Sequence, residues 1–149
     1  MTKEVWEEII RDGAYVQELD WYAIDNKGNI AMFSAIMYAP IPDKIKKSYS
    51  NYIELKQFID SLPQSTSFVL TTTEEGNFSC WTSYAEKGLF AFDFHDVHRT
   101  TAKNQYDLIA RPVLPLNFRS VNIPTNLLDA LVMLDCEFFN GDLPIELIK

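Results

Sequence analysis

The sequence predicts an α+β fold with a mostly antiparallel sheet. Two pairs of β-rich segments, each joined by a polar connection, predict two hairpins, and a long segment with helical spacing of apolar residues predicts a central helix. The chain has 149 residues, 47% of them hydrophobic, so a core can form without a disulfide or a metal. No repeat or Gly/Ser-rich linker divides residues 1–149. We therefore expect a single globular domain in which the sheet packs against the helix.

The first hairpin is predicted within Leu19–Phe33. Aromatic and β-branched residues fill two runs, and Asp25–Gly28 joins them with the residue types of a tight turn. Successive side chains of a strand point to opposite faces, and both faces of the first run are largely apolar. We therefore expect this hairpin to be covered on both faces or to lie in the middle of the sheet, with Trp21, Ile24 and Phe33 in the core.

The second hairpin is predicted from Leu89–Phe94 and Tyr106–Arg111, which are separated by a polar loop. The central helix is expected over Asp43–Leu62, because Asp43 is a good N-cap residue and Pro63 cannot continue a helix. The apolar residues at helical spacing, which would form its buried side, are Ile45, Tyr49, Tyr52, Leu55, Ile59 and Leu62.

Further elements are predicted outside the hairpins and the central helix, including a short strand at Phe68–Thr73 and a short helix that begins at Pro124. Apolar spacing predicts a helix over Lys3–Asp12, with Thr2 as its cap. The segment Phe78–Lys87 fits the period of a strand as well as that of a helix, and we favour the helix because Gly88 is typical of a helix end. A last strand is expected at Cys136–Phe139.

The formal net charge of −8 limits the partners of the chain. Nucleic-acid phosphates would be repelled, and the one short basic run, Lys44–Lys47, has no aromatic or Gly-rich motif beside it. An acidic surface favours a basic protein partner instead. Charged residues interrupt the first ten positions, and no run approaches the roughly 20 apolar residues of a membrane span. We therefore expect a cytoplasmic protein that binds neither nucleic acid nor membrane.

The two cysteines, Cys80 and Cys136, both lie in apolar patterns. A reactive thiolate needs an exposed, electropositive setting, so we expect two reduced and buried thiols. The chain also has no Gly-x-Ser-x-Gly motif for an activated serine. The sequence therefore indicates no catalytic residue.

The polar loop of the second hairpin holds both histidines of the chain. Imidazoles and carboxylates can ligate a metal, and His95, Asp96 and His98 are the candidate ligands. A His-x-x-His pair outside a helix lacks the fixed geometry of known zinc motifs, and nothing indicates a third ligand. We therefore expect no metal and no cofactor. We expect instead an exposed acidic loop in which Asp93, His95, Asp96 and His98 contact a partner.

Three segments are similar to a loosely defined group of small bacterial α+β proteins. The segments are Asp20–Asp25 with Gly28–Ala31, then Tyr84–Asp93, then Tyr106–Pro112. The matching positions are mostly aliphatic and aromatic, so the resemblance implies a shared core and transfers no catalytic residue. By size, acidity and α+β composition the chain also resembles immunity proteins, which neutralise toxins.

We therefore expect a non-enzymatic interaction protein that binds a basic partner, with toxin neutralisation as the specific hypothesis. Two alternatives stay open. One is a small metal-dependent enzyme that uses the Asp93–His98 loop, and the other is a small-molecule-binding domain that uses the aromatic residues. The sequence does not fix the oligomeric state.

Overall fold

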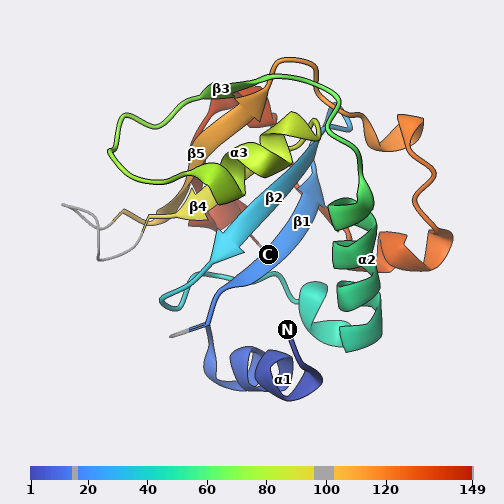
Figure 1. The fold of residues 1–149 in the computed structure, drawn as a ribbon. Coiled ribbons are helices and arrows are strands. Elements are labelled where there is room, and N and C mark those ends of the chain that lie inside the picture. Colours follow the sequence, from blue (N-terminus) through green and yellow to red (C-terminus); the bar gives the residue numbers. More distant parts are fainter. Residues whose placement is uncertain (15–16, 96–102, 149) are drawn as a thin grey trace.

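A twisted mixed sheet forms the centre of the computed structural model, which describes residues 1–14, 17–95 and 103–148 (Figure 1). The strand order is β3-β5-β4-β2-β1-β6, and β7 pairs with β5 off this path. In chain order the strands are β1 (Leu19–Ile24), β2 (Ile30–Ala35), β3 (Phe68–Leu70), β4 (Phe90–Phe94), β5 (Gln105–Pro112), β6 (Val132–Met133) and β7 (Leu143–Pro144). The described residues form a single α+β domain, as the sequence predicts.

Both expected hairpin pairs are present and antiparallel, β1 with β2 and β4 with β5. The prediction of a mostly antiparallel sheet holds in part, because in the described part of the chain four strand pairs are antiparallel and two are parallel. The hairpins are joined by a parallel β2–β4 pair, and β1 also pairs in parallel with β6, so the sheet is mixed. This arrangement places β2 in the middle of the sheet and β1 between β2 and the edge strand β6, and nearly all side chains of β1 and β2 are buried.

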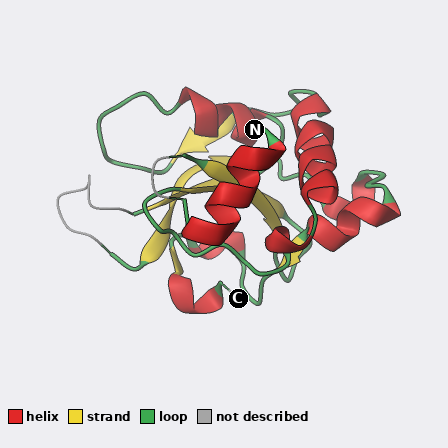
Figure 2. Cartoon of the chain, turned by 90° about the horizontal axis from the view of Figure 1, so that it is seen from below, coloured by secondary structure: helices red, strands yellow, loops and turns green. Residues whose placement is uncertain are grey.

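Three α-helices and several short 3-10 helices surround the sheet in the described residues (Figure 2). The α-helices are α1 (Lys3–Asp12), α2 (Tyr49–Ser61) and α3 (Ser79–Glu86). The 3-10 helices are η1 (Ile45–Lys47), η2 (Phe118–Ser120), η3 (Thr125–Ala130), η4 (Phe138–Asn140) and η5 (Ile145–Leu147). The helix favoured for 78–87 is confirmed as α3, which lies across the sheet, whereas α2 stands beside β1 (Figure 1).

Two expected boundaries are wrong for local reasons. The helix predicted from Asp43 begins at Tyr49, because Ser48 is extended and its Oγ accepts a hydrogen bond from the backbone N–H of Asn51 at 3.3 Å. The chain before it forms η1 instead. The strand expected at Cys136–Phe139 is absent, since Phe138 starts the short helix η4 and packs into the core.

Each face of the sheet has its own hydrophobic core. On one face, α1 and the C-terminal segment cover a cluster that contains Trp21, Phe33 and Phe92. On the other face, α2, α3 and η3 cover a cluster that contains Tyr22 and Met32. The residues expected in the core, Trp21, Ile24 and Phe33, are all buried. One end of the second face is polar, and this end holds the candidate site.

Candidate functional site

Four polar residues form a row across one end of the sheet, one from each of four neighbouring strands. The β1–β2 register places Asp20 beside Ser34, and the β2–β4 register places Ser34 beside Asp93. The β4–β5 register then places Asp93 beside Asp107. Because paired residues point to the same face, all four lie on the face that α2 and α3 cover. We call Asp20, Ser34, Asp93 and Asp107 the polar row.

The β5 end of the row is an ordered carboxylate–imidazole arrangement. His95 is buried, and its Nδ1–H donates to an oxygen of Asp107. The side-chain amide of Gln105 donates to the other Asp107 oxygen at 2.6 Å and to Asp142 at 3.3 Å. Asp142 also accepts the backbone N–H of Leu108 at 2.8 Å. A carboxylate bonded to Nδ1 fixes the imidazole tautomer and orientation, as general-base histidines require.

The β1 end of the row is a second cluster, in which charged and phenolic groups meet. The Lys56 ammonium lies 4.0 Å from Asp20 and 3.3 Å from Asp60. The Tyr84 hydroxyl lies 3.5 Å from an Asp20 oxygen and shares a hydrogen bond with Tyr22. Burial raises the pKa of Asp20 to about 6, although Lys56 opposes this change. Burial also raises the pKa of Tyr84.

Small cavities open at both ends of the row. The cavity at the β5 end has a volume of about 170 Å³ and is lined by Thr71, Thr72, Thr73, Glu74, His95, Lys103, Asp107, Leu108 and Asp142. The cavity at the β1 end has a volume of about 370 Å³ and is lined by Met1, Thr2, Val5, Gln17, Glu18, Asp20, Tyr52 and Lys56. We call the first one the β5 cavity.

Two of the three threonine hydroxyls of the β5 cavity are hydrogen-bonded to the backbone. Thr71 donates to the carbonyl of Leu108, and the hydroxyl of Thr72 accepts the N–H of Glu74 at 3.2 Å. Neither hydroxyl is therefore arranged as a nucleophile against His95. The arrangement orients an imidazole and gathers carboxylates at this end of the row.

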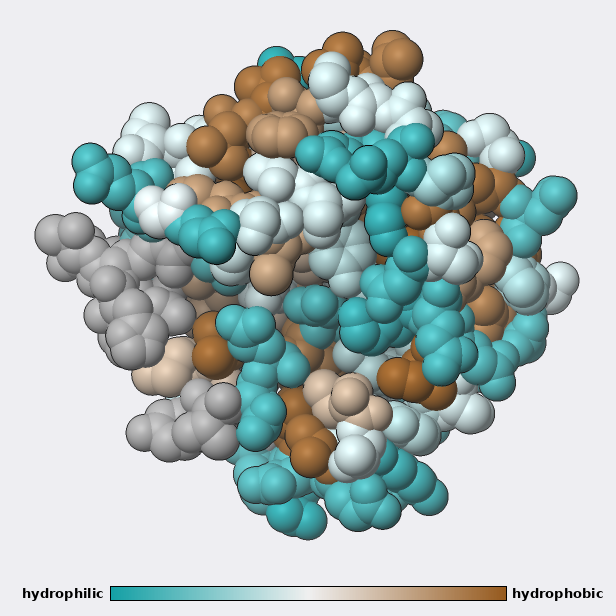
Figure 3. All heavy atoms as spheres, viewed as in Figure 1, coloured by the Kyte–Doolittle hydropathy of each residue, from teal (hydrophilic) through white to brown (hydrophobic). Residues whose placement is uncertain are grey.

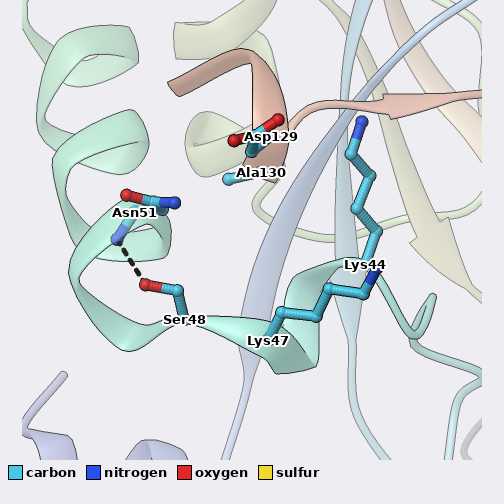
Figure 4. Close-up of a pocket in the computed structure, with 6 residues that line it drawn as sticks. All are labelled: Lys44, Lys47, Ser48, Asn51, Asp129 and Ala130. Atoms are coloured by element: carbon cyan, nitrogen blue, oxygen red, sulfur yellow. Dashed lines mark hydrogen bonds between the residues drawn. The ribbon is translucent and has the colours of Figure 1, made fainter. Parts of the chain in front are cut away.

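A third cavity of about 300 Å³ lies between η3 and the start of α2 (Figure 4). Lys44, Lys47, Ser48 and Asn51 line it on one side, and Asp129 and Ala130 on the other. Its polar groups serve the fold, because Lys44 donates to the carbonyl of Leu131 at 2.8 Å and Ser48 caps α2. This basic run is therefore part of the structure around α2.

Strand β3 forms an exposed apolar edge of the sheet. Its three residues, Phe68, Val69 and Leu70, are 37–45% exposed. Val113 and Leu114, which follow β5, are also exposed, the latter by 68%. All five residues belong to β3 or directly follow β5, and Figure 3 shows apolar side chains gathered over this part of the sheet. We call these five residues the β3 patch.

The backbone of β3 is also open on its outer side. Val113 donates its N–H to Ser67 and Thr71 donates to Ile109, so alternate residues of this segment face β5. The N–H and C=O groups of Phe68 and Leu70 therefore point away from β5, and no strand in the described part of the chain pairs with them. An exposed edge with unpaired backbone groups is a template for another strand.

The structure changes the predicted partner-contact site. Asp93 and His95, expected in an exposed loop, are both buried, because Asp93 belongs to β4 and His95 packs against Asp107. Asp96 and His98 lie outside the described residues. Sequence reasoning missed Asp20 and Asp107, since only strand pairing brings them into line with Asp93.

The two cysteines differ in their exposure to solvent. Both are free, but Cys80 is exposed on α3, so the prediction of burial is wrong for it. The apolar residues around Cys80 in sequence lie on another side of the short helix, where Tyr84 and Ala85 are buried. Cys136 is half-buried, and burial raises the pKa of its thiol to about 11.

No family model, curated protein or solved structure matches this chain. Among the residues described, no group of three or more His, Cys, Asp or Glu side chains is arranged to hold a metal ion. Within the same part of the chain, no helix has the length and apolar character of a membrane span.

Proposed function

We propose that this chain is a non-enzymatic interaction protein that binds an extended segment of a positively charged protein along β3. The observation that carries the proposal is the open outer edge of β3, where apolar side chains and outward-facing backbone groups occur together. A strand added to such an edge gains main-chain hydrogen bonds, and the side chains supply specificity.

The three-residue edge lacks charged side chains, proline and a bulge, which are three of the features that prevent strand addition. Proteins protect edges with charged side chains, proline or bulges, whereas Phe68, Val69 and Leu70 are all apolar. The opposite edge, β6, has only two residues and offers fewer backbone groups. Strand β3 is therefore the better docking edge.

Charge favours a basic partner over a second copy of this chain. Two copies would each contribute a net charge of −8 and would repel each other at an edge-to-edge contact. A basic protein would be attracted, and its association rate would fall with salt. Neutralisation of a basic toxin is one specific form of this function, because an inhibitor needs only to cover a surface of its target.

A neutral strand-forming peptide, Ac-Thr-Val-Thr-Val-Thr-NH2, tests the docking edge without any contribution from charge. We expect nitrogen–proton NMR spectra of the full chain to show peptide-dependent shifts at Phe68 and Leu70. Leu70→Lys should remove this binding, because an edge lysine blocks strand addition. Met133→Lys places the same charge on the opposite edge and should leave binding unchanged.

Two results would contradict the proposal. One is a set of shifts confined to β6 or to the cavities, with β3 unaffected at millimolar peptide. The other is a stable dimer in sedimentation equilibrium that Leu70→Lys dissociates, because β3 would then be occupied by a second copy.

A further inference from the structure

We infer that Arg111 selects the partner segment, and that this segment carries an aspartate or glutamate opposite Val69, where the guanidinium of Arg111 binds its carboxylate. The inference rests on the proposed docking at β3. It names the chemistry of the docked segment, an extended strand with apolar residues on one face and a carboxylate on the other.

The register of β3 on β5 divides the docking edge into two faces. Phe68 pairs with Pro112 and Leu70 with Ala110, whereas Val69 pairs with Arg111. Because successive side chains of a strand alternate between faces, Val69 and Arg111 lie on one face, and Phe68 and Leu70 lie on the other. A residue docked directly opposite Val69 therefore shares the face of Arg111, whether the added strand runs parallel or antiparallel to β3.

The guanidinium of Arg111 is available to a carboxylate from outside the chain. Its neighbours in β5, Ala110 and Pro112, are buried, whereas Arg111 is partly exposed. Within the described part of the chain, this side chain has neither a hydrogen bond nor an ion pair. The other two described arginines are engaged, since Arg11 pairs with Asp12 and Arg119 lies over the Phe118 ring at 4.8 Å.

The distance from Arg111 to a docked residue suits two side chains that meet over Val69. Neighbouring strands lie about 4.8 Å apart, so the Cα atoms of Arg111 and of the docked residue, with β3 between them, are roughly 10 Å apart. An arginine and a glutamate side chain span this gap from its two ends, because the valine between them is short. The methylene groups of Arg111 can pack across Val69, which is 37% exposed. The planar guanidinium can then bind both carboxylate oxygens.

A carboxylate at this position is compatible with a basic partner, because the two charges act over different distances. The net charge of −8 attracts a basic protein before contact. Arg111 acts only on the docked residue that faces it, and it would repel a lysine or arginine there. Arg111 therefore distinguishes among basic proteins by a single position of the docked segment.

Two isosteric peptides test the inference, Ac-Thr-Val-Glu-Val-Thr-NH2 and Ac-Thr-Val-Gln-Val-Thr-NH2. With the valines on the face of Phe68 and Leu70, the central residue of each peptide lies opposite Val69. We expect the glutamate peptide to bind about threefold more tightly at low salt, as a partly exposed ion pair implies, and to shift the side-chain Nε–H resonance of Arg111. The overall charge of the protein opposes this gain, so tighter binding reports the local contact. The gain should shrink as salt is raised.

Matched variants assign the preference to Arg111. Arg111→Gln should abolish it and leave the affinity for the glutamine peptide unchanged, which also shows that the variant folds. Arg111→Lys keeps the charge without the guanidinium fork and should retain only part of the preference. Arg119→Gln removes the same charge beside the β1–β2 turn and should leave the preference intact.

The inference is wrong if both peptides bind the parent equally, or if the preference for glutamate survives Arg111→Gln. In either case, shifts at Phe68 and Leu70 with the glutamine peptide would still support docking at β3. Absence of these shifts with both peptides would contradict the proposed function, and the inference would fail with it.

Discussion

The carboxylate of Asp25 accepts the backbone N–H of Phe138 at 2.9 Å, and this bond ties the β1–β2 turn to the C-terminal segment. The same carboxylate accepts the N–H groups of Lys27 and Asn29 at 2.9 Å, and the Asn29 amide at 3.2 Å. One buried side chain therefore closes the turn and also anchors η4. The aspartate is structural, in agreement with the sequence interpretation of this segment as a turn.

Asp25→Ala should destabilise the chain by about 3 kcal/mol, because charge-assisted bonds are lost and the N–H of Phe138 is left without its partner. Asp25→Asn retains one acceptor oxygen and should cost about half as much. Urea unfolding followed by tryptophan fluorescence measures both values. A loss below about 1 kcal/mol for the alanine variant would show that the anchor is unimportant.

Trp21→Ala should cost about 3–5 kcal/mol, since the indole is fully buried and stacks on Phe33 with ring centroids 4.2 Å apart. Trp21→Phe keeps the aromatic contact but loses the indole N–H that donates to the Tyr106 hydroxyl at 3.2 Å. Its cost should be about 1–2 kcal/mol. Thermal unfolding by circular dichroism distinguishes the two, and equal melting temperatures for the alanine variant and the parent would contradict this packing.

The raised pKa of Asp20 makes the free energy of unfolding depend on pH. Its pKa rises from 3.8 to about 6 on folding, chiefly through burial, so the folded state holds its proton more tightly. The protonated Asp20 carboxyl therefore adds to the free energy of unfolding. This stabilisation reaches its maximum below about pH 4 and is lost as the pH rises through 6. Asp20→Asn removes the ionisation and should stabilise the chain at pH 8 by on the order of 1–2 kcal/mol, because the side chain is only 25% exposed.

Carboxyl-carbon NMR titration gives the Asp20 pKa directly, and urea unfolding at pH 5 and pH 8 gives the stability difference. Glu75→Gln, at an exposed position, is the matched control and should not change the pH profile. An Asp20 pKa near 4, or equal stability of Asp20→Asn and the parent at pH 8, would refute the prediction.

The two thiols should react at clearly different rates in the native protein. Cys80 is exposed, whereas Cys136 is half-buried with a pKa raised to about 11, so its thiolate fraction at pH 8 is very small. A chromogenic disulfide reagent should modify one thiol per chain quickly, and Cys80→Ser should abolish that fast phase. A fast phase that persists in Cys80→Ser would assign the reactivity to Cys136.

The parts of the fold that the sequence predicted are those with local signals. The turn chemistry of Asp25–Gly28 and the alternation around Trp21 identify the β1–β2 hairpin without any long-range information. The start of α2 was misplaced because Asp43 and Ser48 are both good caps, and only the extended backbone of Ser48 selects between them.

The candidate site depends on pairings between distant segments. The parallel contact of β2 with β4 has no local signature, so Asp20 and Asp107 could not be placed in one row with Asp93. The outward-facing groups of Phe68 and Leu70 likewise depend on the β3–β5 register. The sequence predicts a short strand at Phe68–Thr73 but not its exposure, which follows from the position of β3 at the end of the strand order.

Amide hydrogen exchange at β3 tests the central claim, an open edge that accepts a strand, most directly. In the free protein, the Val69 N–H faces β5 and should be protected, whereas the Phe68 and Leu70 N–H groups should exchange at nearly unprotected rates. Saturating neutral strand peptide should slow exchange at Phe68 and Leu70 and leave Val69 unchanged. Protection of Phe68 and Leu70 already in the free protein, or fast exchange that the peptide does not alter, would contradict the account.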